Sequence, residues 1–423
     1  MIDKGEVLKL SHRLGAAAVA FLTAAGLTAC ADNANDANDA DNAKNANSTT
    51  AAAQTDSTGA SSKPRTTDGA ITVTDAAGRK LEFEEQPDRI VLAEGRAAYA
   101  TALLQEHPRD NVVAYGQDLE KAAPSFRDKL FEVQPDAKDM PVIGAIQKGD
   151  VTVENLLAQD PDVVIMTLDQ KKAVEESGFI SDMDKAGITY AFIDFRQKPL
   201  ENTTVSMTLL GDLLGQPERA KKYNEFYTAK VKDITDRAAK IADKPDVLLW
   251  TAAGYTDCCA VAGDAHLGTL VTAAGGHNLG PEVLGTENTT ITVEKLVELN
   301  PEKLIVTGGE WARDPNKTDA FRHVELGYQS SPELALESCD GPLQQPGLDL
   351  LDAPKNGNYF AVYHQFYDNP FNVFALEAFA KWIHPEEFKD LNPTQDFKDF
   401  HKEWMPFEYS GEFFIDPAHL EES

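Results

Sequence analysis

The sequence predicts an α/β protein whose folded part consists of two lobes joined by one long helix. Strand-like and helix-like segments alternate from Ile71 to about residue 195, and the alternation starts again after Pro245. Such alternation indicates parallel sheets covered on both faces. Between the two runs, residues 216–243 contain Pro217 at a plausible first helical turn and no later breaker, which predicts a rigid helix of about 25 residues, roughly 37 Å long. A chain of 423 residues is long enough for two such lobes.

The first lobe is predicted to span residues 69–215. Two strand-like runs flank the turn "AAGRK" and predict an opening hairpin. Apolar runs predict the strands that follow, and amphipathic runs predict the helices between them. In order, these segments are the strand in "DRIVLAEG", the helix "AAYATALLQE", the strand "NVVAYG", the helix "VENLLAQD", the strand "DVVIMTL", the helix "ISDMDKAG", the strand "TYAFIDF" and the helix "LENTTVSMTLLGDLLG", which ends at Gly215.

The second lobe is predicted to span residues 244–423 and to repeat this alternation of strands and helices. A stretch rich in Pro, Gly and Asp, residues 311–357, interrupts it. The predicted elements are the strand "DVLLWTA", the helices "LGTLVTAAGG" and "VEKLVELN", the strand "KLIVTGG", the strand "YFAVYHQ" and the helix "NVFALEAFAKWIHPEEF".

The first 68 residues have a different composition. Residues 1–30 combine a basic start with an apolar run too short for a good transmembrane span, and they end in Leu27-Thr28-Ala29-Cys30. This ending resembles the lipobox of bacterial lipoproteins, in which the cysteine is acylated and becomes the new N-terminus; an ordinary signal peptide that contains a cysteine is the alternative. Residues 31–68 are mostly Ala, Asn, Asp, Ser and Thr, so we expect a disordered polar tether.

Net charge and cysteine content bear on three properties: nucleic-acid binding, disulfide formation and metal binding by thiolates. A formal net charge of −30 argues against nucleic acid as a partner. Cys258, Cys259 and Cys339 follow the lipobox cysteine, and an exported chain can oxidise them. We expect Cys339 to pair with one of the two neighbours; a bond between the adjacent pair is the alternative. No CxxC spacing supports a thiolate metal site.

The two lobes contain one short sequence twice. "VTVENLLAQDPDVVI" begins at residue 151 and "ITVEKLVELNPEKLI" at residue 291. Thr152 and Thr292 stand where helix N-caps belong, and Glu154 and Glu294 fall in the first helical turn. Capping alone explains a glutamate at this position, but it says less about why the two copies align so closely.

These pieces, in this order, resemble a known family. The lipobox, "ITVTDAAGRKLEFEEQPDRIV", "LLAQDPDVVI", "LLGQPERAKKY", "GTLVTAAGGHNLG" and "LVELNPEKLIV" together resemble the periplasmic-binding-protein-like family that serves importers of ferric siderophores, heme and cobalamin, over roughly residues 70–410. The resemblance implies a monomeric binding protein without catalysis or cofactor, held by lipid on the extracytoplasmic face of the cell membrane. It also implies a ligand cleft between the lobes and docking on an ABC permease dimer through Glu154 and Glu294.

Ligand-contacting side chains are expected in loops at the carboxyl ends of the strands. The candidates are Glu94, Arg96, Tyr99, Lys148, Arg196, Tyr255, Trp311, Arg313, His364 and Tyr367. Arginine suits the carboxylate or phenolate oxygens of an anionic ferric chelate, and His364 and Tyr367 are possible iron ligands if the chelator leaves a position open. Each candidate has a structural alternative: Arg96 in a surface pair, and Tyr99, His364 and Tyr367 in packing.

The predicted function is therefore the delivery of a siderophore-type ferric chelate to an ABC importer. A heme or cobalamin receptor of the same fold is the first alternative. An exported enzyme that processes metal chelates is an alternative of another class, but GxGxxG, GxxxxGK[ST] and GxSxG are all absent from the sequence. A plain adhesive lipoprotein is a third option, although it does not require two lobes.

Overall fold

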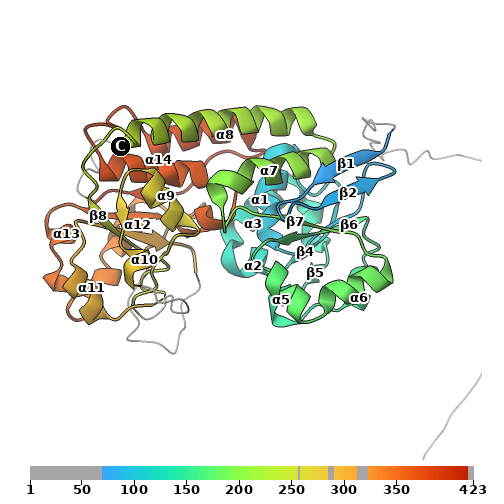
Figure 1. Cartoon of the computed structure of the whole chain (residues 1–423), viewed down its shortest axis with the longest axis horizontal. Helices are drawn as coiled ribbons and strands as arrows, with labels where there is room; N and C mark the ends of the chain where they lie inside the picture. The colour runs from blue at the N-terminus through green and yellow to red at the C-terminus, as the bar shows by residue number, and fades with distance from the viewer. Residues whose placement is uncertain (1–68, 256–257, 284–289, 312–322, 418–423) are drawn as a thin grey trace, which may run out of the picture. The chain divides into compact units, whose positions relative to one another are not determined.

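The computed structural model describes residues 69–255, 258–283, 290–311 and 323–417. Within these residues the chain forms a hairpin, two five-stranded sheets and the helices around them (Figure 1). The parallel pairing in both sheets confirms the predicted α/β class. None of the described helices is both long and apolar enough to cross a membrane.

The first sheet is entirely parallel, with its strands in the order β5-β4-β3-β6-β7. The hairpin and the strands are β1 (Ile71–Thr74), β2 (Lys80–Phe83), β3 (Ile90–Leu92), β4 (Val112–Gly116), β5 (Val142–Ile143), β6 (Val163–Thr167) and β7 (Tyr190–Ile193). The helices are α1 (Ala98–Leu104), α2 (Asp118–Ala122), α3 (Pro124–Val133), α4 (Val153–Leu157), α5 (Lys171–Glu176), α6 (Phe179–Ala186) and α7 (Pro199–Leu213). The central strands β3 and β6 are buried at every residue, which explains their almost continuously apolar sequences.

The second sheet has the order β12-β11-β10-β8-β9 and is parallel except for the edge strand β12. Its strands are β8 (Asp246–Trp250), β9 (His277–Asn278), β10 (Lys303–Gly308), β11 (Tyr359–Tyr363) and β12 (Phe414–Ile415). Its helices are α9 (Leu267–Ala273), α10 (Gly280–Val283), α11 (Val293–Leu299), α12 (Pro332–Cys339), α13 (Asp352–Lys355), α14 (Asn372–Ile383) and α15 (Pro393–Trp404).

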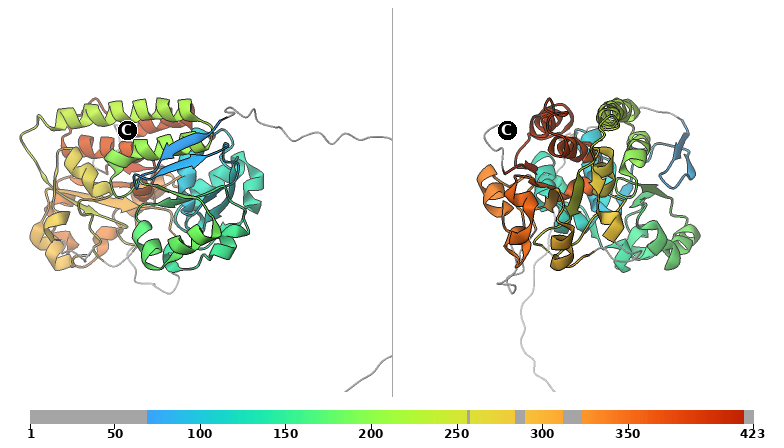
Figure 2. Two further views of the ribbon diagram at one scale, coloured as in Figure 1. Left: turned by 45° about the vertical axis from the view of Figure 1, so that its right-hand side comes forward. Right: turned by 60° about the vertical axis from the view of Figure 1, so that its left-hand side comes forward.

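One long helix, α8 (Pro217–Ala238), leads from α7 to the first strand of the second lobe. It packs against α7 of the first lobe and against α14 of the second, as the views in Figures 1 and 2 show. Lys230 of α8 places its ammonium group 2.5 Å from carboxylate oxygens of both Glu377 in α14 and Asp396 in α15. The helix is therefore tied to both lobes.

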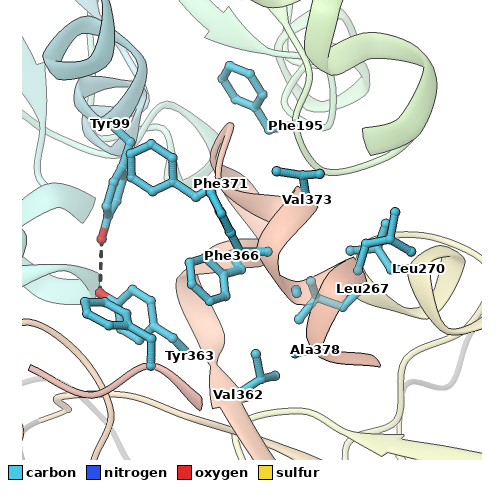
Figure 3. Close-up of a cluster of buried hydrophobic side chains, with 14 of the residues drawn as sticks. Tyr99, Phe195, Leu267, Leu270, Val362, Tyr363, Phe366, Phe371, Val373 and Ala378 are labelled. Atoms are coloured by element: carbon cyan, nitrogen blue, oxygen red, sulfur yellow. Dashed lines mark hydrogen bonds between the residues drawn. The ribbon is translucent and has the colours of Figure 1, made fainter. Parts of the chain in front are cut away.

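The two lobes share one hydrophobic core. A single cluster of buried apolar side chains includes residues of both sheets and of α8. At its centre the hydroxyl of Tyr99 in α1 lies 3.0 Å from the hydroxyl of Tyr363 in β11, and Phe371 packs edge-on against the Tyr99 ring (Figure 3). A smaller cluster covers the other face of the first sheet. Separating the lobes would expose the shared core to water, which opposes large opening movements.

The structure favours the alternative cysteine pairing over the expected one. The described structure joins Cys258 to Cys259, and Cys339 is a free, buried thiol. Cys339 ends α12, where its carbonyl oxygen accepts a hydrogen bond from the hydroxyl of buried Tyr359. Cys258 and Cys259 instead lie in the segment after β8, where Cys259 exchanges backbone hydrogen bonds with Ile291. The thiol of Cys339 thus belongs to the helix-to-sheet packing of its lobe.

Candidate ligand-binding site

Charged and aromatic side chains gather where the parallel strands of both sheets end. Arg96 follows β3, Arg196 follows β7 and Tyr367 follows β11. The chain can turn sharply before Arg96 because residue 95 is glycine: a Cβ there would lie 2.3 Å from the carbonyl oxygen of Gly116, at the end of β4. The carboxyl ends of several strands are therefore brought close together, as expected for a ligand site in an open α/β sheet.

Arg96 is buried and connects the two lobes. Its Nε donates to Asp118 of its own lobe over 3.1 Å, and the Asp118 carboxylate also accepts the backbone N–H groups of residues 95 and 96. A second nitrogen, Nη2, pairs with Glu94. From the other lobe, Gln365 accepts a hydrogen bond from Nη1 over 3.1 Å, and the Tyr367 hydroxyl also accepts from Nη1. Arg96 is thus held by its own lobe and aimed at the opposite one.

Arg196 makes a parallel set of contacts. Its Nη1 pairs with Asp169, which follows β6 in the same lobe. Its Nη2 lies 2.7 Å from Oδ2 of Asp368 and 3.1 Å from the Tyr367 hydroxyl, both in the second lobe. Its carbonyl oxygen accepts a 3.0 Å hydrogen bond from the backbone N–H of His266. His266 has a φ of +57°, a region that L side chains rarely adopt, so its backbone is strained where it meets Arg196.

Tyr367 occupies the centre of this cluster. Both guanidinium groups lie over its ring, at 5.2 Å for Arg96 and 4.7 Å for Arg196. The imidazole of His266 lies parallel to the ring at a centroid distance of 5.8 Å, and that of His364 is 4.7 Å away. Two imidazoles and two guanidinium groups therefore pack around one phenol ring.

Burial and the two arginines shift the pKa values of one carboxyl group and two imidazoles of the cluster. Burial raises the pKa of Glu94, but Arg96 and Arg196 outweigh burial and lower it to about 2, so this carboxylate is permanently ionised. Burial, together with the positive charge of the nearby arginines, lowers the pKa of His266 to about 4 and of His364 to about 3. Both imidazoles are therefore neutral at physiological pH, with a lone pair available for a proton or a metal.

Several buried polar atoms of the cluster have no hydrogen-bond partner among the described residues. They are Nε of Arg196, Oδ1 of Asp169, Oδ1 of Asp368 and Oγ1 of Thr167. Buried polar atoms are normally paired, so four unpaired atoms in one cluster indicate hydrogen-bonding capacity that a bound molecule can use.

An aromatic group extends the cluster in the second lobe. Trp311 is 9% exposed and lies 4.8 Å from the ring of half-exposed Tyr255 and 5.0 Å from His364. His364 also shares a 2.7 Å hydrogen bond between Nδ1 and the Thr307 hydroxyl at the end of β10. These rings form an apolar surface next to the charged groups.

The structure brings most of the predicted residues together, with three exceptions. Glu94, Arg96, Arg196, His364 and Tyr367 meet in the cluster, and Trp311 and Tyr255 adjoin it. Tyr99 is fully buried in the shared core, stacked on Phe126 at 3.6 Å, which favours the packing interpretation. Lys148 is exposed, and no described contact connects it to the cluster. Arg313 lies outside the described residues, as does Cys30.

Sequence reasoning missed four residues of the cluster: Asp118, Asp169, Asp368 and His266. The three aspartates each follow the end of a strand, which is the same signal that selected the arginines. The expectation of an anionic chelate favours arginine at these positions and gives no reason to select the carboxylates that hold it. His266 carries no comparable signal, since it precedes a helix and reaches the cluster through an unusual backbone conformation.

The two copies of the repeat adopt the same local structure. The Thr152 hydroxyl accepts the backbone N–H of Asn155, and the Thr292 hydroxyl accepts that of Lys295, both over 3.2 Å. The glutamate two residues later is exposed in each copy, and the leucine four residues after each threonine is buried. No described contact connects either glutamate with the arginine cluster. Within the described residues, no group of three or more His, Cys, Asp or Glu side chains is arranged to hold a metal ion.

Comparison with known proteins agrees with this architecture. The chain is 21% identical over 290 residues to an uncharacterized ABC transporter substrate-binding lipoprotein, YvrC, of Bacillus subtilis, covering 66% of this chain and 84% of that protein. It is 26% identical over 247 residues to a cobalamin-binding protein of Halobacterium salinarum, covering 56% of this chain and 58% of that protein. The TroA-like periplasmic binding protein FepB of Veillonella parvula superposes with a TM-score of 0.73 at 27% identity, over 82% of this chain and 99% of that one.

The family assignment follows from the extent of the match. The family described as periplasmic binding protein matches residues 114–325, which run from the second strand of the first sheet to beyond β10. This family and the matched proteins bind solutes, which confirms the expectation of a non-catalytic protein. With its two α/β lobes and a polar cluster at their strand ends, the chain belongs to the periplasmic binding protein family.

Proposed function

We propose that this chain is the extracytoplasmic binding lipoprotein of an ABC importer and that it delivers a ferric chelate of the siderophore type. The matched Bacillus subtilis protein is named as a substrate-binding lipoprotein of an ABC transporter, which supports the transport role. The ligand assignment rests on the cluster at the strand ends, argued below.

The single observation that supports an anionic chelate is the pair of buried arginines that face one tyrosine. Arg96 and Arg196 both reach the Tyr367 hydroxyl, and Nε of Arg196 has no partner among the described residues. Guanidinium groups bind carboxylate, catecholate and phenolate oxygens through paired N–H donors. Two of them at one point are suited to a compact ligand that carries several anionic oxygens.

The same cluster offers donor atoms to the iron cargo itself. A phenol oxygen and a neutral imidazole are good ligands for ferric iron. Tyr367 supplies the oxygen, and His364 or His266 supplies the nitrogen, since both rings contact the Tyr367 ring. These side chains would complete the coordination of a chelator that leaves iron positions open.

Cobalamin is the second candidate ligand. One matched relative is named as a cobalamin-binding protein. The rings of Trp311 and half-exposed Tyr255 offer apolar contact to a large organic ligand. Heme is an alternative on the same chemical grounds.

Fluorescence titration of the purified protein tests the ligand class, because Trp311 adjoins the cluster. We expect a ferric catecholate to quench tryptophan emission at micromolar concentration, and a Tyr367→Phe variant to bind it about tenfold more weakly through loss of the phenol oxygen. A Tyr255→Phe variant is the matched control, and its affinity should match the wild type. Saturable quenching by cobalamin alone would select the second candidate. If neither the ferric catecholate nor cobalamin quenches the tryptophan emission to saturation, the proposed role as a receptor for these ligands is rejected.

Docking on the permease is assigned to Glu154 and Glu294. They are exposed, occupy equivalent helix starts in the two lobes and lie outside the ligand cluster, so they suit matched basic contacts on two permease subunits. Reversing both to lysine should abolish uptake while ligand affinity stays unchanged, because exposed charges steer association and fix register. The matched control is Glu298→Lys, an exposed glutamate of the same helix α11. Normal uptake by the folded double variant would reject docking through Glu154 and Glu294, and the repeat would then be explained by helix capping alone.

Membrane attachment is assigned to acylation of Cys30. Acyl chains hold a protein at a membrane surface without a spanning helix. A Cys30→Ala variant should be released from the membrane or remain unprocessed, and fractionation followed by a high-salt wash measures this. A variant that stays fully attached after the wash would contradict the lipid anchor.

A further inference from the structure

Asp368 differs from the other carboxylates around the arginines because it comes from the opposite lobe. It ends the short 3₁₀ turn after β11, His364–Asp368, and its side chain is 2% exposed. Its Oδ2 lies 2.7 Å from Nη2 of Arg196 and 3.0 Å from Nη2 of Arg96. One carboxylate oxygen of the second lobe thus bridges both guanidinium groups of the first.

The arginines do not need Asp368 for charge balance. Within the first lobe Arg96 pairs with Glu94 and Asp118, and Arg196 pairs with Asp169. The first lobe thus supplies three carboxylates for two guanidinium groups, and Asp368 of the second lobe is a fourth. The additional negative charge is unfavourable: burial, followed by the like charges of Glu94 and Asp169, raises the pKa of Asp368 to about 7, although both arginines lower it.

The contact is also incompletely satisfied. Oδ1 of Asp368 accepts no hydrogen bond from the described residues, and Nε of Arg196 donates none. A buried ion pair that serves stability normally satisfies its remaining donors and acceptors. The carboxylate therefore occupies the position between the arginines without using their full hydrogen-bonding capacity.

We propose that Asp368 is an internal stand-in for the ligand: its carboxylate occupies the place between Arg96 and Arg196 that an anionic oxygen of the bound chelate takes. This inference rests on the proposed function. Binding is then an exchange of one anionic oxygen for another, and Asp368 sets both the affinity and the charge preference of the site. A ligand must present at least one anionic oxygen that reaches both guanidinium groups, and it must displace Asp368 to do so.

The exchange predicts the effect of neutralising the stand-in. At pH 8, where the carboxyl group of Asp368 is ionised in the wild type, an Asp368→Asn variant keeps the size of the side chain but removes its charge, so an anionic ligand no longer competes with a carboxylate. We expect an anionic ferric tris-catecholate to bind this variant at least tenfold more tightly than the wild type. A cationic ferric tris-hydroxamate should gain nothing. An Asp368→Glu variant, which keeps the charge, should retain an affinity close to that of the wild type.

The matched control is Glu377→Gln. Glu377 is also a buried carboxylate of the second lobe, but its partner is Lys230 of α8 and it contacts neither arginine. Its neutralisation should leave chelate affinity within about twofold of the wild type. Circular dichroism and the thermal midpoint of each variant establish that the proteins compared are folded.

A second experiment does not require a ferric chelate. Inorganic phosphate presents anionic oxygens to the arginines without any metal, and calorimetric titration measures its affinity. We expect the Asp368→Asn protein to bind phosphate about tenfold more tightly than the wild type. If phosphate binding rises but no ferric chelate binds, the stand-in is supported and the siderophore assignment is rejected. If neither phosphate nor tris-catecholate binds the variant more tightly, Asp368 is an ordinary ion-pair partner and the inference is overturned.

Discussion

Glu94 of the first lobe and Glu310 of the second both lie near contacts between the lobes, yet their pKa values move in opposite directions. Burial raises the pKa of each carboxyl group. At Glu94 two arginines outweigh burial and lower the pKa to about 2. At Glu310 no arginine intervenes: its partners are the Ser125 hydroxyl and the backbone N–H of Gln329, Glu325 adds a like charge, and the pKa rises to about 7.

This difference describes the two sides of the site. The first lobe presents two arginines and Glu94 as permanent charges, because the arginines lower the pKa of Glu94 to about 2, whereas burial raises the pKa of its Asp118 to about 6. The second lobe presents aromatic rings, neutral imidazoles and carboxyl groups whose ionisation is costly. A ligand that bridges the lobes therefore meets fixed donors on one side and polarisable, neutral surface on the other.

The largest effect is expected from removing the fixed charge. An Arg96→Ala variant leaves the buried Glu94 and Asp368 and the partly buried Asp118 without one of their cations, so we expect it to lose about 3–5 kcal/mol of unfolding free energy. Denaturant titration measures the loss. The matched control is Arg237→Ala, whose side chain is 25% exposed and pairs with Asp233 and Asp390; it should cost under about 1 kcal/mol. Equal losses in both variants would show that the cluster is no more coupled than a surface ion pair.

The pH dependence of stability tests the raised pKa of Glu310 in the second lobe. Because the folded protein raises the pKa of Glu310 from 4.5 to about 7, it binds the proton more tightly than the unfolded chain does. The stabilisation from this group is therefore complete at low pH and is lost as pH rises through about 7. Relative to a Glu310→Gln variant, the wild type should lose about 1–3 kcal/mol of stability between pH 4.5 and pH 7.5. A constant difference between the two proteins across this range would contradict the raised pKa.

A neutral contact between the lobes should matter less. The hydroxyls of Tyr99 and Tyr363 form one buried hydrogen bond, so Tyr99→Phe should cost about 1 kcal/mol. A double-mutant cycle with Tyr363→Phe isolates the pair, and the double variant should lose less than the sum of the single losses. Strict additivity would mean that the two hydroxyls do not depend on each other.

The smallest effect is expected at Lys148. It is exposed and makes no described contact with the cluster, so Lys148→Ala should change unfolding free energy by less than about 0.5 kcal/mol. Its affinity for a ferric catecholate should equal that of the wild type in the same fluorescence titration. A marked loss of affinity would place this lysine in the ligand site and extend the charged side of the first lobe.

The sequence alone predicted the α/β class and many of the elements in their order, although not the short strands β5, β9 and β12 or the helices α12 and α15. Apolar runs fixed β3 and β6, capping threonines fixed the starts of α4 and α11, and the absence of a breaker between Pro217 and Pro245 fixed α8. These features depend on interactions between residues close in the chain, which periodicity and capping chemistry express directly. The loops that carry Arg96, Arg196 and Tyr367 followed from the same reasoning, since each loop begins where a strand ends.

Only the tertiary structure decided which of these groups meet. Asp368 contacts Arg96, from which it is separated by 272 residues of chain. His266 reaches Arg196 through a backbone conformation that no local pattern predicts. Tyr99 is buried in the hydrophobic core. Packing likewise places Cys339 as a buried free thiol within its own lobe. Contacts between distant loops depend on how two sheets are placed by a shared core and a long helix, and this placement has no signature in the spacing of the residues that it brings together.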